Sequence, residues 1–161
     1  MDSVRYRHNP VGDVMVELGK NISEDSRWLV DFVRRAGAAV IASNSGTGYP
    51  ESAYVHVAAS DAGRIIFGTN ALSRKFTNIT SDPRVSLVIV NDGAEEVQLE
   101  GEAAVLDETQ VAAAAEVLSA QHPDSAETSD PENMRLLEVT VRWASHTDAR
   151  EVPPAQRELQ L

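Results

Sequence analysis

The sequence predicts a mainly β protein with peripheral helices, built around a small antiparallel barrel of six strands. Apolar or alternating stretches of strand length recur along most of the chain, and short turns rich in Gly, Asn and Asp join most of them. Helical patterns occur only before or between these stretches, and no internal repeat is visible. This arrangement is typical of a closed antiparallel sheet whose ends are covered by helices.

Three helices are expected because a residue that favours helix N-termini precedes each helical pattern. These capping residues are Ser23, Ser73 and Asp107. The first helix carries an apolar stripe and ends at Gly37, and the alanine-rich third helix runs to about residue 120. The middle helix is expected over residues 74–81, and a further short helix over residues 12–18.

Six strands are expected from apolar runs and from alternation of apolar and polar residues. They cover residues 38–43, 51–59, 64–67, 85–90, 95–106 and 136–143. A turn over 68–72 should follow the third strand, and the Asn91-Asp92-Gly93 sequence predicts a hairpin. Gly101 lies inside the fifth strand, where glycine indicates a bulge or a close approach of another backbone.

The chain length of 161 residues suits a single domain. We expect this domain to span residues 23–146, with an N-terminal extension over 1–22 and a C-terminal tail over 147–161. The tail is inferred because it has few apolar residues and contains Pro153-Pro154.

Composition excludes several classes of function. The chain has no cysteine, so disulfides, thiol nucleophiles and cysteine-based metal sites are absent. The four histidines show no spacing typical of metal ligands, so no metal site is expected. The net charge of −11 argues against nucleic-acid binding, and there is no apolar run of membrane-span length or signal peptide. We therefore expect a cytoplasmic protein without nucleic-acid or membrane partners.

The segment over residues 64–84 is a basic island in this acidic chain, with four Arg or Lys residues and one Asp. Arg74 and Lys75 fall in the first turn of the expected helix, where the helix dipole disfavours positive charge. Together with free backbone N–H groups and the hydroxyls of Thr69 and Ser73, they form a group suited to an anion, most simply a phosphate. The alternative is a surface helix whose basic side chains are only solvated.

Four stretches resemble one protein family: AVIASNSGTGYPESAYV, IIFGTN, SRKFTNITSDPRVSLVIV and VQLEGEAAVL. They are similar to the pyridoxamine 5′-phosphate oxidase-like FMN-binding split barrels, over about residues 24–145. The resemblance implies a six-stranded antiparallel split β-barrel and a homodimer with two flavin sites across the subunit interface. It also implies that the turn between the third strand and the middle helix holds the FMN phosphate.

Carried over residue by residue, the resemblance implies a set of cofactor-binding residues. The phosphate binders would be Thr69, Ser73, Arg74 and Lys75. The strand segment that contains Ser52 and Tyr54 would run along the flavin ring.

The resemblance also implies contacts to the flavin from the partner subunit. Trp143 lies near the position of a tryptophan that approaches the ring in the family. The family often has a Gln at the entry to the fifth strand. Alignment on Gly101 puts Glu96 at that position and Gln98 two residues later, so either residue is a candidate.

The function that follows is an FMN-dependent oxidoreductase in which hydride passes between a small-molecule substrate and the flavin, with NAD(P)H a candidate reductant. No catalytic side chain is assigned, because this chemistry needs no protein acid or base. Pyridoxamine 5′-phosphate oxidase activity is not expected, since the family's C-terminal Arg-x-His-Asp-Arg signature is missing. The alternatives are an F420-dependent reductase, a non-catalytic flavin-binding protein, and a structural dimer that has lost its cofactor.

Overall fold

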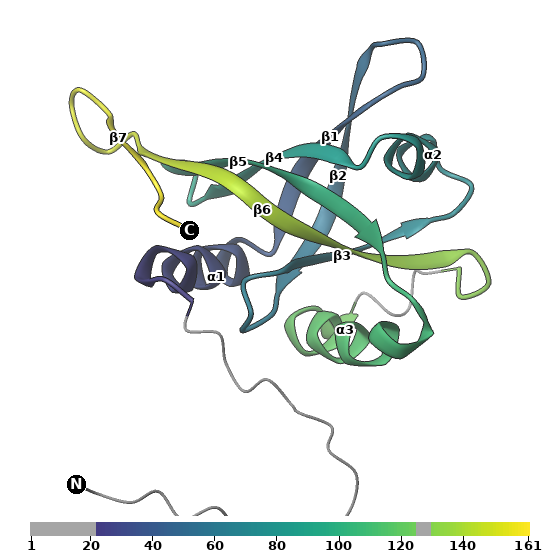
Figure 1. Cartoon of the computed structure of the whole chain (residues 1–161). Helices are drawn as coiled ribbons and strands as arrows, with labels where there is room; N and C mark the ends of the chain where they lie inside the picture. Colours follow the sequence, from purple (N-terminus) through teal and green to yellow (C-terminus); the bar gives the residue numbers. More distant parts are fainter. Residues whose placement is uncertain (1–21, 125–129) are drawn as a thin grey trace, which may run out of the picture.

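The structure is a computed structural model that describes residues 22–124 and 130–161 (Figure 1). Its elements, in chain order, are α1 (Glu24–Ala36), β1 (Ala38–Asn44), β2 (Pro50–Ala59), β3 (Ile65–Asn70), α2 (Arg74–Ser81), β4 (Arg84–Asn91), β5 (Glu95–Val105), α3 (Glu108–Gln121), β6 (Met134–Asp148) and β7 (Ala155–Glu158). The N-terminal extension expected over 1–22, apart from Ile22, and the helix expected over 12–18 lie outside the described residues.

The sheet confirms the expected six-stranded antiparallel barrel and adds one strand. Its strand order is β3-β2-β1-β4-β5-β6-β7, and β3 also pairs with β6, which closes the first six strands into a barrel. Every strand pairing among the described residues is antiparallel. The register shifts at Gly101, which confirms the expected irregularity. A Cβ atom there would lie 2.5 Å from the Thr140 carbonyl oxygen, so only glycine allows this approach.

Two strands are longer than their sequence patterns indicate. β3 continues to Asn70, where a turn beginning at residue 68 was expected, and β6 runs over Met134–Asp148 instead of 136–143. The cause is pairing between distant segments, since Thr69 lies opposite Arg135 and Asn70 opposite Met134. The alternation of apolar and polar residues within a strand does not indicate which distant segment it pairs with.

The C-terminal segment 147–161, expected to be a tail, instead adds a seventh strand to the sheet. β7 pairs with the end of β6, and Leu159 is 4% exposed within the main core. Contacts to α1 fix the segment further: Arg157 forms an ion pair with Asp25 at 2.9 Å, and the Gln160 N–H donates to the same carboxylate at 2.7 Å. A single buried leucine and these polar contacts order a stretch that has little apolar character of its own.

Helices cover the barrel at separate places. Figure 1 shows α1 against one end of the barrel, beside the C-terminus, and α3 against the outside of β3 and β6. Phe32 and Val33 of α1 are fully buried in the barrel core. α3 packs through a smaller apolar cluster that includes Ile66, Leu106 and Ala114. Within the described ranges no helix is long and apolar enough to cross a membrane.

Candidate functional site

The turn from β3 into α2 brings two hydroxyl groups together. The Ser73 side chain caps α2 by accepting from the Phe76 N–H at 3.2 Å. Asn70 holds the turn, since its side-chain oxygen accepts from the Leu72 N–H at 2.8 Å and its carbonyl accepts from the Ser73 N–H at 3.0 Å. As a result the Thr69 and Ser73 hydroxyl oxygens lie 3.1 Å apart.

Lys75 extends back over this turn. Its ammonium donates to the Thr69 hydroxyl, which is almost fully buried. Burial lowers the pKa of Lys75 below its ordinary value, because desolvation disfavours the charged form. Among the ion pairs of the described residues, none involves Lys75. Its positive charge is therefore available to a bound anion. We call Thr69, Ser73 and Lys75 the anion cradle.

Arg74 has a different environment from its neighbour. Its guanidinium forms an ion pair with Glu51 of β2, while most of the side chain is exposed. The same carboxylate accepts from the Asn78 side-chain amide at 2.9 Å, and that amide also donates to the Ser43 hydroxyl at 3.2 Å. The two basic residues of the first turn of α2 thus point to different partners.

The anion cradle lies at the boundary of two cavities. One, of about 500 Å³, lies between β2, β3, β6 and α3, and we call it the β2–α3 cavity. Its polar lining includes Thr69, Ser73 and Lys75, and its apolar lining includes Ala115, Leu118, Met134 and Leu136. Gly68 also lines it; a Cβ atom there would lie 3.0 Å from the Met134 sulfur, so the glycine leaves the cavity open.

The second cavity, also of about 500 Å³, lies on the other side of Ser73 and Lys75, and we call it the Glu51 cavity. It is lined by Ile41, Ser43, Glu51, Ser52, Ala53, Ser73, Arg74 and Lys75. The two cavities share only Ser73 and Lys75 among their lining residues. Within the described ranges, no cluster of three or more His, Asp or Glu side chains could hold a metal ion.

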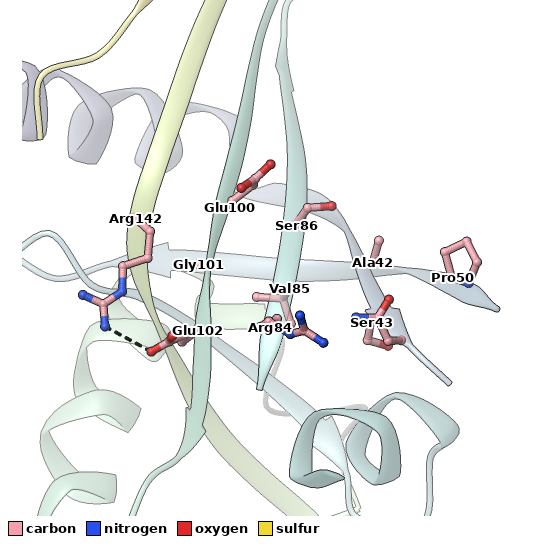
Figure 2. Close-up of a pocket in the computed structure, with 11 residues that line it drawn as sticks. Ala42, Ser43, Pro50, Arg84, Val85, Ser86, Glu100, Gly101, Glu102 and Arg142 are labelled. Atoms are coloured by element: carbon pink, nitrogen blue, oxygen red, sulfur yellow. Dashed lines mark hydrogen bonds and ion pairs between the residues drawn. The ribbon is translucent and has the colours of Figure 1, made fainter. Parts of the chain in front are cut away.

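A third cavity, of about 430 Å³, lies on the outer face of the sheet (Figure 2). Figure 2 shows the Arg142 side chain of β6 directed toward Glu102 of β5, with which it pairs at 3.0 Å. Arg84 pairs with Asp82 at 2.6 Å and holds the pKa of that carboxyl well below its usual range. Both cations of this cavity are therefore already neutralised, which makes it a poorer phosphate site than the anion cradle.

A family model described as pyridoxamine 5′-phosphate oxidase matches residues 27–148. The chain belongs to the pyridoxamine 5′-phosphate oxidase family. The membership confirms the resemblance drawn from the sequence motifs. No curated protein is significantly similar in sequence.

Solved structures share the fold of this family member at low identity. A pyridoxamine 5′-phosphate oxidase-related, FMN-binding protein from Nostoc punctiforme has a TM-score of 0.66 at 15% identity, over 89% of this chain and 100% of its own. A conserved hypothetical protein from Mycobacterium tuberculosis has a TM-score of 0.65 at 21% identity, over 87% of this chain and 93% of its own.

A haem-binding protein from Mycobacterium smegmatis has a TM-score of 0.70 at 15% identity, over 85% of this chain but only 59% of its own. At these identities the comparisons show a common fold and leave the ligand open.

The structure brings together some of the predicted site residues of this pyridoxamine 5′-phosphate oxidase family member. Tyr54 lines the β2–α3 cavity with the anion cradle, while Ser52 and Arg74 line the Glu51 cavity. Gln98 and Trp143 line neither cavity; Gln98 lies opposite Ser145, and Trp143 lies opposite Glu100. Their predicted contact with the flavin would have to come from a partner subunit.

Glu51 and the α3 side chains of the site were not predicted from the sequence. Glu51 is one of many acidic residues in the chain, and no local pattern distinguishes it. Leu118 and Ala115 read as ordinary positions of a helix, and only the packing of α3 beside β2 and β3 brings them to the cavity. Only the pairing of Glu51 with Ser43 in the sheet reveals that Glu51 lies near the site, and this pairing is not visible in the sequence.

Proposed function

We propose that the protein binds FMN, with the phosphate in the anion cradle and the ring in the β2–α3 cavity, and acts as a flavin-dependent oxidoreductase. The observation that carries this proposal is the position of Lys75. It is a partly desolvated cation without an acidic partner among the described residues, held on a buried hydroxyl at the mouth of a cavity with apolar walls. Such a cation gains most from a charged hydrogen bond to a phosphate.

The residues present fit this cofactor. The hydroxyls of Thr69 and Ser73 and the ammonium of Lys75 supply donors to phosphate oxygens at the N-terminus of α2. Apolar side chains of α3 and β6 line one side of the cavity, and Tyr54 adds an aromatic surface on β2. When bound, FMN would supply hydride transfer to and from a small-molecule substrate.

The partner contacts require a homodimer, which we propose forms through the outer face of the sheet. Val40 is 44% exposed and lies opposite Tyr54 on β2, which is 67% exposed. On the other side Val40 faces Val88, and Gln98 follows on β5. Pairing of two such faces would cover this apolar surface and bring Trp143 and either Gln98 or Glu96 toward the flavin of the other subunit.

The same site supports a narrower statement about substrate. The segment Arg142-Trp143-Ala144-Ser145-His146 stands where the missing oxidase signature would be, and it lies inside β6. The His146 ring packs against Trp28 at 4.7 Å between ring centroids, and its Nε2 lies 3.2 Å from a Glu95 oxygen. Because His146 serves the fold in this way, we propose that pyridoxamine 5′-phosphate is not the substrate.

Haem is a second candidate for the same cavity, because two side chains that can ligate iron, His56 and Met134, line it. The haem-binding protein of Mycobacterium smegmatis shares the fold. F420 remains an alternative to FMN, and a non-catalytic flavin-binding protein remains an alternative to the oxidoreductase.

The absorption spectrum of protein purified from cells separates these candidates, and titration of the apoprotein with FMN, F420 and haemin ranks them. We expect flavin bands and FMN binding at micromolar or lower concentration. Reduction of the bound FMN by NADH or NADPH, followed by reoxidation with candidate acceptors, distinguishes an oxidoreductase from a binding protein. Light scattering should give the mass of a dimer. A haem spectrum, or no affinity for FMN, would refute the proposal.

A further inference from the structure

Glu51 places a fixed negative charge beside the anion site. Its side chain is 22% exposed and pairs with Arg74, whose side chain is 83% exposed. On the other side, Glu51 accepts from the Asn78 amide at 2.9 Å. Asn78 is itself buried on the inner face of α2 and also donates to Ser43. The carboxylate is therefore held by the fold, while the arginine is the exposed member of the pair.

Two positive charges and one negative charge consequently surround the phosphate position. Lys75 faces the β2–α3 cavity as well as the Glu51 cavity, whereas Arg74 lines only the latter, together with Glu51. If Arg74 stays on Glu51, its charge is neutralised. If Arg74 turns to a phosphate, the Glu51 carboxylate is left near that anion. In either case the net positive charge offered to the ligand is about one. The Arg74–Glu51 pair affects the charge of the site in this way although an exposed ion pair contributes little to folding stability.

We propose that Glu51 is a specificity-determining residue that restricts the site to ligands with a single phosphate and no further acidic groups nearby. This inference rests on the proposed function, since it concerns the same anion cradle. A ligand such as F420, whose side chain carries carboxylates in addition to its phosphate, would meet an uncompensated negative charge at Glu51. FMN has one phosphate and would be disfavoured less.

Glu51→Gln tests the inference, because Gln keeps an oxygen for Asn78 and removes the charge. FMN affinity should rise about tenfold, as expected when Arg74 is freed for a charged hydrogen bond. The affinity for F420 should rise by a larger factor, and that of riboflavin, which lacks the phosphate, should not change. Glu151→Gln is the matched control: Glu151 is an exposed residue between β6 and β7, and its replacement changes the net charge equally.

Arg74→Ala gives an independent measurement in a protein that keeps Glu51. It should lower FMN affinity by less than about threefold in the wild type, and by about tenfold in the Glu51→Gln background. A tenfold loss in the wild type would overturn the inference even if Glu51→Gln failed to fold. Equal losses in the two backgrounds would also overturn it.

Inorganic phosphate separates failure of this inference from failure of the proposed function. Phosphate should raise the Tm of Glu51→Gln more than that of the wild type, whichever cofactor the protein uses. Absence of FMN binding in every variant, with the expected phosphate effect, would refute the function and leave the inference standing. An unchanged or weaker response of Glu51→Gln to both FMN and phosphate would overturn the inference.

Discussion

Replacement of Lys75 by Ala should remove most of the phosphate affinity without unfolding the protein. From the sequence alone, Arg74 and Lys75 are expected to contribute equally to the free energy of FMN binding. Loss of both side chains should then cost about 3–6 kcal/mol. The structure distinguishes the two residues. The Arg74 guanidinium pairs with Glu51, whereas the Lys75 ammonium donates to the Thr69 hydroxyl and has no acidic partner among the described residues. The larger share should therefore belong to Lys75.

The expected loss for Lys75→Ala is about 1.5–3 kcal/mol, the usual contribution of a charge-assisted hydrogen bond, or roughly 10- to 150-fold in Kd. Stability should change little. Thr69 keeps its neighbour Ser73 at 3.1 Å, alanine favours the helix, and removal of a positive charge from the first turn of α2 relieves an unfavourable interaction with the dipole.

Fluorescence quenching titrations with FMN and riboflavin measure the effect, and urea unfolding checks the fold. Riboflavin should bind the wild type and Lys75→Ala equally. If Lys75→Ala binds FMN as tightly as the wild type, the cation at residue 75 is only solvated and the proposed phosphate site is wrong. If both ligands weaken equally, the substitution has altered the cavity and the phosphate assignment is not supported.

Three further outcomes follow from the same structure. Gly101→Ala should lose about 1–3 kcal/mol of unfolding free energy, because its Cβ would meet the Thr140 carbonyl oxygen. Gly46→Ala is the control and should not lose stability, because a Cβ atom at Gly46 would lie in open space. The urea unfolding midpoints of the two variants measure the difference. Leu159→Ala should cost about 2–3 kcal/mol in the same assay if the C-terminal segment is part of the core.

FMN affinity should fall as pH rises through the lowered pKa of Lys75, because the neutral amine loses its charge; this fall should begin below the ordinary lysine pKa of 10.5. Lys75→Arg, which stays protonated, should retain binding at that pH if the guanidinium reaches the phosphate. Titrations at several pH values measure both proteins, and a wild-type affinity independent of pH up to the ordinary lysine pKa of 10.5 would contradict the assignment.

The sequence could predict α2 and the anion cradle because both depend on neighbouring residues. Ser73 caps α2, which spans the expected residues 74–81. Thr69, Ser73 and Lys75 are within seven positions of one another, so the turn alone brings them together. A short-range group of this kind is fixed by capping and turn geometry, whatever the rest of the barrel does.

The remainder of the site depends on contacts between distant segments. Glu51 reaches Arg74 across 23 residues and Asn78 across 27, and nothing near Glu51 in the chain indicates either partner. The C-terminal strand is a similar case: β7 has four residues, three of them polar, and is ordered by β6 and α1. Periodicity detects a strand that has an apolar face of its own, and it fails where the partner supplies the order.

The position of Lys75 is unfavourable to the fold in two ways, and one ligand would reverse both. Its charge lies in the first turn of α2, against the helix dipole, and it is partly removed from water. Lysine at an exposed position of the same helix would avoid the desolvation, and a neutral residue would avoid both costs. A bound phosphate would interact favourably with the dipole and with the ammonium, and so convert each unfavourable interaction into part of a binding site. With Lys75 present, a bound anion relieves both costs, and this is the physical reason for proposing that the turn binds a phosphate.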